Sequence, residues 1–126
     1  MDQDYINVKN NIVAQAKYYL EQADEFYPFG AVINKNHELK PVSVYFEEDT
    51  PNALDVLNRL ENALTEGIKN GEYISAGIGV DVYVKIDQEK RAALEVRFFE
   101  EEKIVKSFFL YFKKQGQYYF QEHLQL

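Results

Sequence analysis

Four polar residues in the C-terminal half of the sequence are the best candidates for chemistry. Asp81 and Tyr83 fall in one expected strand, and Glu95 and Arg97 fall in the next strand along the chain. In each strand they alternate with apolar residues, so we expect all four on the row opposite the apolar one, together with Lys85. Such a cluster could bind a polar ligand or perform acid–base chemistry. Charge pairing across a solvated sheet face is the commoner explanation of the same pattern.

The residue types that most metal and nucleophilic sites require are scarce. The sequence has no cysteine and two histidines, His37 in an expected hairpin loop and His123 near the C-terminus. Neither histidine belongs to a metal-ligand spacing, and both are expected to be exposed. Two strand glycines, Gly77 and Gly79, are not followed by a helix and do not form a phosphate-binding loop. We therefore predict no catalytic residue, no metal site and no cofactor, which favours a non-enzymatic protein.

Aromatic residues are abundant and predict an interface. The chain has 10 tyrosines and 9 phenylalanines, many of them adjacent in pairs that place a ring on each face of a strand. We expect Phe99, Phe109 and Tyr111 on a sheet face opposite the helices, where their area would favour a homodimer. Gly77 and Gly79 would let a ligand, a second chain or a ring such as that of Phe99 approach this face. Covering of the rings by the chain's own loops is the alternative.

The segment Phe26-Tyr27-Pro28-Phe29-Gly30 is a second aromatic group, placed where a helix is expected to end. A residue before proline is disfavoured in helical geometry, so the chain must turn here. The segment could be a contact site for a partner or an apolar plug beneath the first helix.

The elements that position these residues are indicated by their hydrophobic periods. Apolar residues recur every three to four positions over residues 5 to 25 and 53 to 68, which predicts two amphipathic helices. Thr50-Pro51 is expected to open the second helix and Asn70-Gly71 to close it. Alternation or apolar runs between polar turns predict strands over 31–33, 39–47, 73–86, 91–100, 104–113 and 118–124.

The order of these elements predicts an α+β fold of one domain, residues 1–126. The order is α-β-β-α-β-β-β-β, with short connections and no linker composition. We expect a two-layer sandwich in which two helices pack on one face of a mainly antiparallel sheet of about six strands.

The charge balance restricts the partners. Lysine and arginine number 14 against 21 aspartates and glutamates, which gives 14 − 21 = −7. Phosphate neutralisation requires clustered cations, so we predict no nucleic-acid binding. Apolar stretches are much shorter than a membrane span and no secretory signal is evident, so we expect a soluble cytoplasmic protein without a membrane partner.

The run from Phe26 to Ile33, the later Pro51 that opens a helix, and the strand from Ala76 to Val82 resemble a group of small bacterial proteins with a Pro-Phe-Gly-Ala signature. The resemblance covers most of the chain and implies a bacterial origin, but no activity. The function we predict is therefore protein binding or self-association. The alternative is a small-molecule-binding domain or enzyme that uses the polar cluster around Asp81 and Glu95.

Overall fold

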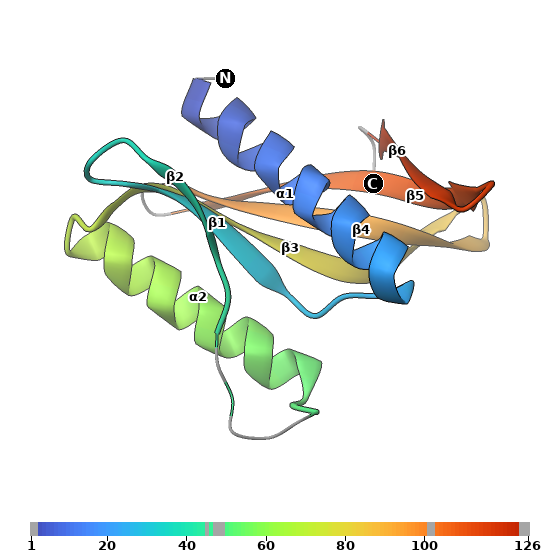
Figure 1. The fold of residues 1–126 in the computed structure, drawn as a ribbon, viewed down its shortest axis with the longest axis horizontal. Coiled ribbons are helices and arrows are strands. Elements are labelled where there is room, and N and C mark those ends of the chain that lie inside the picture. Colours follow the sequence, from blue (N-terminus) through green and yellow to red (C-terminus); the bar gives the residue numbers. More distant parts are fainter. Residues whose placement is uncertain (1–2, 45, 47–49, 101–102, 124–126) are drawn as a thin grey trace.

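The computed structural model describes residues 3–44, 46, 50–100 and 103–123. It contains helices α1 (Gln3–Ala23) and α2 (Ala53–Lys69) and strands β1 (Phe29–Asn34), β2 (Leu39–Val42), β3 (Tyr73–Ile86), β4 (Glu89–Glu100), β5 (Lys103–Lys114) and β6 (Gln117–His123). The strands form one antiparallel sheet in the order β2-β1-β3-β4-β5-β6 (Figure 1). The predicted α+β class and the order of elements are confirmed.

Two hairpins of the sheet turn through only two residues. Asp87 and Gln88 connect β3 to β4 with φ angles of 51° and 66°, and Gln115 and Gly116 connect β5 to β6 with φ angles of 53° and 81°. Two consecutive positive φ angles match the twist of the flanking strands, which favours this tight turn. The first turn pairs Ile86 with Glu89. Odd-numbered residues of β3 therefore lie beside even-numbered residues of β4.

The two helices lie on opposite faces of the sheet, which differs from the single covered face that we predicted. Val8 and Ile12 of α1 pack in one core cluster with Leu94, whereas Leu60 of α2 packs in a second cluster with Ile78. Leu94 pairs with Asp81 of β3, so the two side chains lie on the same face of the sheet. Asp81 is odd-numbered and Ile78 is even-numbered, so their side chains point to opposite faces of β3 and the two clusters lie on different faces. Helix, sheet and helix thus form three layers over the central strands.

The glycines of β3 explain how α1 comes so close to the sheet. A Cβ atom at Gly77 would lie 2.8 Å from Cγ1 of Val8, and one at Gly79 would lie 2.8 Å from Cγ2 of Ile12. The neighbouring row of β3, which contains Ile78, packs against α2. Both rows of side chains in this strand are apolar or small because both of its faces are covered. The glycines allow α1 to pack closely on one of these faces.

The helix ends differ in part from the predicted ones. α1 ends where Asp24 adopts a φ of 62° and donates its backbone N–H to the carbonyl of Leu20 at 2.8 Å, a left-handed position that aspartate tolerates better than most residues. α2 is capped by Asn52, whose side chain accepts from the N–H of Leu54, rather than by Thr50. The predicted stop is confirmed, since Asn70 is the C-cap and Gly71 follows with a φ of 81°.

β2 is shorter than predicted and ends at Val42. Ser43, Val44 and Phe46 leave the sheet and lead toward α2, while residues 45 and 47 of the predicted strand lie outside the described residues. Neither α1 nor α2 has the length and apolarity that a membrane-spanning helix needs.

Candidate functional site

The structure does not bring the four predicted polar residues together. Asp81 pairs with Leu94 on the face covered by α1, and Glu95 pairs with Val80 on the face covered by α2. Arg97 shares the face of Glu95, because residues two apart in a strand point the same way. The four residues therefore form two groups on opposite faces of the sheet. The reason is that the two-residue turn pairs odd-numbered residues of β3 with even-numbered residues of β4.

Glu95 and Arg97 are already neutralised within the fold. Nε of Arg97 donates to Oε1 of Glu95 at 2.5 Å, and Nη1 donates to Oε1 of Glu61 at 2.6 Å. The side chain of Glu95 is only 8% exposed, and Nζ of Lys106 lies 3.9 Å from its second oxygen. Buried charges persist when they are paired and hydrogen-bonded. This network links α2 to β4.

Asp81 belongs to a hydrogen-bonded group on the other face. Its Oδ1 atom accepts a hydrogen bond from the hydroxyl of Tyr111 at 2.7 Å. Burial raises the pKa of Asp81, opposed by hydrogen bonding from Tyr111 and from the backbone N–H of Phe26. Burial, with the carboxylate beside it, also raises the pKa of Tyr111. Tyr83, the fourth member of the predicted cluster, is exposed with Nζ of Lys90 lying 4.3 Å from its ring centroid.

The three rings predicted at an exposed interface are not exposed together. Phe109 is 7% exposed in the cluster under α1, and Phe99 is 8% exposed in the cluster with α2. Tyr111 is half-buried at its bond to Asp81. Phe99 and Phe109 do not share one free face, because Phe109 packs in the cluster with α1 and Phe99 in the cluster with α2. Phe99 and Phe109 are core residues.

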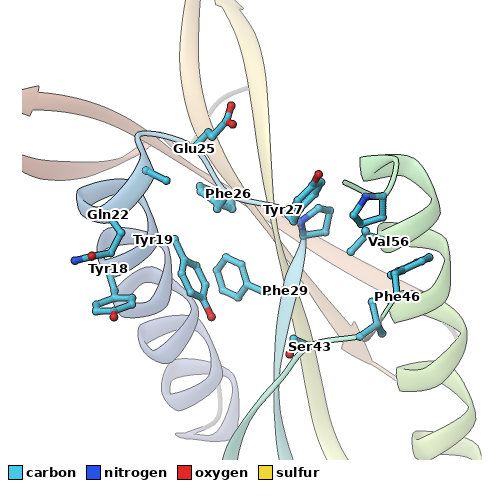
Figure 2. Close-up of a pocket in the computed structure, with 14 residues that line it drawn as sticks. Tyr18, Tyr19, Gln22, Glu25, Phe26, Tyr27, Phe29, Ser43, Phe46 and Val56 are labelled. Carbon is cyan, nitrogen blue, oxygen red and sulfur yellow. The ribbon is translucent and has the colours of Figure 1, made fainter. Parts of the chain in front are cut away.

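An apolar hollow with a volume of about 490 Å³ lies where α1 ends and α2 begins. We call it the aromatic cleft. Figure 2 shows α1 on one side and α2 on the other, with strands of the sheet passing between them. The cleft is lined by Tyr18, Tyr19, Gln22, Ala23, Glu25, Phe26, Tyr27, Pro28, Phe29, Ser43, Val44, Phe46, Pro51 and Val56.

Edge-to-face packing of rings builds the wall of the cleft beside α1. Phe29 receives the edge of two neighbours, with centroid separations of 5.2 Å to Tyr19 and 5.4 Å to Phe26. This arrangement is the favourable one for aromatic quadrupoles and holds the rings in fixed orientations. Phe29 is buried, whereas Tyr18 and Tyr27 project outward with exposures of 61% and 46%. The cleft thus has a rigid apolar floor and a rim of tyrosines.

Polar contacts position the segment that forms this wall. The side-chain amide of Gln15 donates to the carbonyl of Gly30 at 3.1 Å, and its oxygen accepts from the hydroxyl of Tyr19 at 3.1 Å. Asp24, at the end of α1, accepts from the hydroxyl of Tyr118 at 2.6 Å and from Nζ of Lys113 at 3.1 Å. These donors lower the pKa of Asp24, the tyrosine hydrogen bond being the largest cause. The connection from α1 to β1 is therefore held at both ends.

The chemistry of the lining suits binding. Of the lining residues, Glu25 alone is acidic or basic, and the rest are rings, small apolar groups, one serine and one amide. His37 lies exposed in the turn after β1, and His123 lies at the end of β6. Within the described part of the chain, no three histidine or acidic side chains group in a way that could hold a metal ion.

The sequence analysis singled out one part of this site. The aromatic segment from Phe26 to Gly30 is predicted to be either a contact site or an apolar plug beneath the first helix, and the contact site stays a prediction. Phe29 is the buried plug and Tyr27 is an exposed ring at the rim. The sequence did not predict the opposite wall, which is formed by Ser43, Val44, Phe46, Pro51 and Val56. No local pattern marks those residues, because they meet the aromatic segment only in the folded chain.

No protein-family model, curated protein or solved structure matches this chain. Function therefore has to be inferred from the geometry of the site.

Proposed function

We propose that this protein is a non-enzymatic binding domain that receives an apolar side chain of a partner protein in the aromatic cleft. The observation that carries the proposal is the cleft itself, a hollow of about 490 Å³ with a floor of packed rings. An apolar side chain that leaves water for such a hollow gains roughly 1.5–3 kcal/mol. The exposed rings of Tyr18 and Tyr27 extend the contact beyond the hollow, and tyrosine is enriched at protein interfaces.

The composition of the lining supports binding rather than catalysis. General acid–base or nucleophilic chemistry needs two groups within hydrogen-bond reach of one another and of the substrate. In the lining as described, the single carboxylate is that of Glu25, which is exposed at the rim. We place the protein in the cytoplasm as part of the same proposal, on the ground that the sequence lacks the cysteines typical of oxidising compartments.

Small neutral aromatics provide the test. p-Cresol and indole, which reproduce the tyrosine and tryptophan side chains, are titrated into ¹⁵N-labelled protein while amide chemical shifts are followed. We expect saturable shifts over residues 18–29 and 43–46, with a Kd on the order of 1 mM for ligands of this size. Shifts that are absent, or scattered over the whole sheet, would contradict the proposal.

A variant that fills the cleft is the matched comparison. Ser43 is exposed and lines the cleft, so Ser43→Trp is expected to occupy the hollow and abolish the shifts. Gln121→Trp places the same ring at an exposed position of β6 and should leave binding unchanged. Unfolding of both variants by urea shows whether the fold is retained.

Self-association is a second candidate, favoured by one exposed aromatic pair. Phe112 and Tyr119 stack with centroids 5.8 Å apart and are 46% and 45% exposed. Sedimentation of the wild type and Phe112→Glu is the test, and a monomeric wild type would eliminate this candidate. Phe109→Glu is an unsuitable probe, because Phe109 is buried under α1 and a charge there would disrupt the core.

A further inference from the structure

We infer that the partner segment received by the aromatic cleft is basic, with lysine or arginine flanking the apolar residue that enters the hollow. This inference rests on the proposed function and adds the chemistry of the partner. It follows from the distribution of charge around the cleft, which is uneven between the wall at α1 and the wall at α2.

The wall at α1 has an unneutralised negative charge. The backbone carbonyls at a helix C-terminus carry a partial negative charge, which basic side chains normally balance. α1 has no basic residue in its last turn and is followed by Asp24 and Glu25. Lys113 pairs with Asp24, whereas Glu25 forms no ion pair with any residue that the structure describes.

The carboxylate of Glu25 is placed to meet a charge outside the hollow. Figure 2 shows it at the rim beyond Phe26, directed away from the rings. A ligand side chain on the apolar floor would thus leave its neighbours along the peptide close to this carboxylate. The tyrosine rings at the rim add π faces, which attract lysine and arginine.

The wall at α2 contains a cation–π contact. The guanidinium carbon of Arg59 lies 4.2 Å from the ring centroid of Phe46, which lines the cleft from that side. The net charge of −7 attracts basic segments over a longer range. A free small molecule of about 490 Å³ would leave the outer faces of Tyr18 and Tyr27 unused, which favours a peptide segment.

A displayed library of random peptides tests the inference. The library is selected on immobilised wild type and depleted on Ser43→Trp, so that the peptides retained depend on the cleft. We expect an aromatic or aliphatic residue flanked by lysine or arginine. Binding of a selected peptide, followed by fluorescence anisotropy, should weaken about threefold in Glu25→Gln, the size expected for one exposed charge pair. It should also weaken as salt is raised.

The control is Glu66→Gln, which removes an equal charge from an exposed position in the C-terminal half of α2. If cleft-dependent peptides lack basic residues, or Glu25→Gln and Glu66→Gln bind them equally, this inference fails while the proposed function stands. If no selected peptide loses affinity for Ser43→Trp, the proposed function fails as well.

Discussion

At the residue scale, the polar side chains chosen from the sequence stabilise the fold. Asp81 accepts from Tyr111, and Glu95 binds Arg97. Alternation along each strand predicted them on the row opposite the apolar one. Their partners could not be read from alternation, because the partner of Arg97 in α2 is Glu61, 36 positions away in the sequence. A polar residue in an apolar strand indicates a partner, which here belongs to the same chain.

The hydrogen bond between Tyr111 and Asp81 predicts a pH-dependent loss of stability in Tyr111→Phe. The phenol donates to a partly buried carboxylate at 2.7 Å. Its removal at neutral pH should lower the free energy of unfolding by about 1–2 kcal/mol, because the charged acceptor loses a donor. The pKa of Asp81 is raised, mainly by burial. The Asp81 contribution to stability is therefore present below its unfolded pKa and lost as pH rises through its folded pKa.

The stability difference between wild type and Tyr111→Phe should accordingly shrink as the pH falls and Asp81 becomes protonated. Urea unfolding at a series of pH values from about 7 down to about 3 measures this change. In the Asp81→Asn background the effect of Tyr111→Phe should not depend on pH. A difference that widens at acid pH would show that the carboxylate is not the acceptor that matters.

The network around Arg97 leads to a second prediction at this scale. Arg97→Met leaves the nearly buried carboxylate of Glu95 with only Lys106, at 3.9 Å. Loss of one partner of a buried pair is costly, and we expect about 2–3 kcal/mol because Arg97 itself is partly exposed. The double variant Arg97→Met/Glu95→Gln should be more stable than Arg97→Met alone, as measured by urea unfolding. A double variant that is less stable than Arg97→Met would refute this account.

At the element scale, the close approach of α1 to β3 depends on glycine. Gly77→Ala would place a methyl group 2.8 Å from Cγ1 of Val8. We expect a loss of about 1–3 kcal/mol, as for other overpacked cores. Val8→Ala removes one of the two clashing methyl groups, the other being Cδ1 of Ile12 at 2.9 Å. In combination with Val8→Ala, the loss should therefore be about 1 kcal/mol smaller than the sum of the two single effects.

The opposite face provides the control for this cycle. Val56 of α2 lies in the other core cluster, so the effects of Val56→Ala and Gly77→Ala should add. Urea unfolding of the three single and two double variants gives both coupling energies. Equal coupling of Gly77 to Val8 and to Val56 would mean that the helices are not separated by the sheet.

At the scale of the whole molecule, the two core clusters share one sheet. α1 packs on β1, β3, β4 and β6, and α2 packs on β1 and β3. Loss of either helix would expose one face of strands that the other helix still covers. We therefore expect one cooperative transition for residues 1–126, and the single domain stays a prediction until unfolding is measured.

Far-UV circular dichroism and near-UV tyrosine signals should follow the same unfolding curve. The variants Val8→Ala and Val56→Ala each weaken a different helix, and each should move both signals together. Separation of the far-UV and near-UV curves in either variant would show that one helix detaches first, and would divide the fold into two units.

The sequence by itself determined the elements, because helix and strand periods and turn chemistry act over a few neighbouring residues. The 3.6-residue period gave α1 and α2, alternation gave β3 and β4, and Asn70-Gly71 gave the end of α2. These signals agree with the fold of the antiparallel sheet except in β2, which ends at Val42.

Only the tertiary structure decided which face each row of side chains occupies and where the cleft forms. Because Ile86 pairs with Glu89, odd-numbered residues of β3 lie on the same face as even-numbered residues of β4. Asp81 and Glu95 therefore lie on opposite faces, although each alternates with apolar residues in its own strand. The aromatic cleft joins the end of α1 and the segment before β1 to Ser43, Val44, Phe46, Pro51 and Val56. Such convergence depends on packing between segments distant in the chain, and a local period contains no information about it.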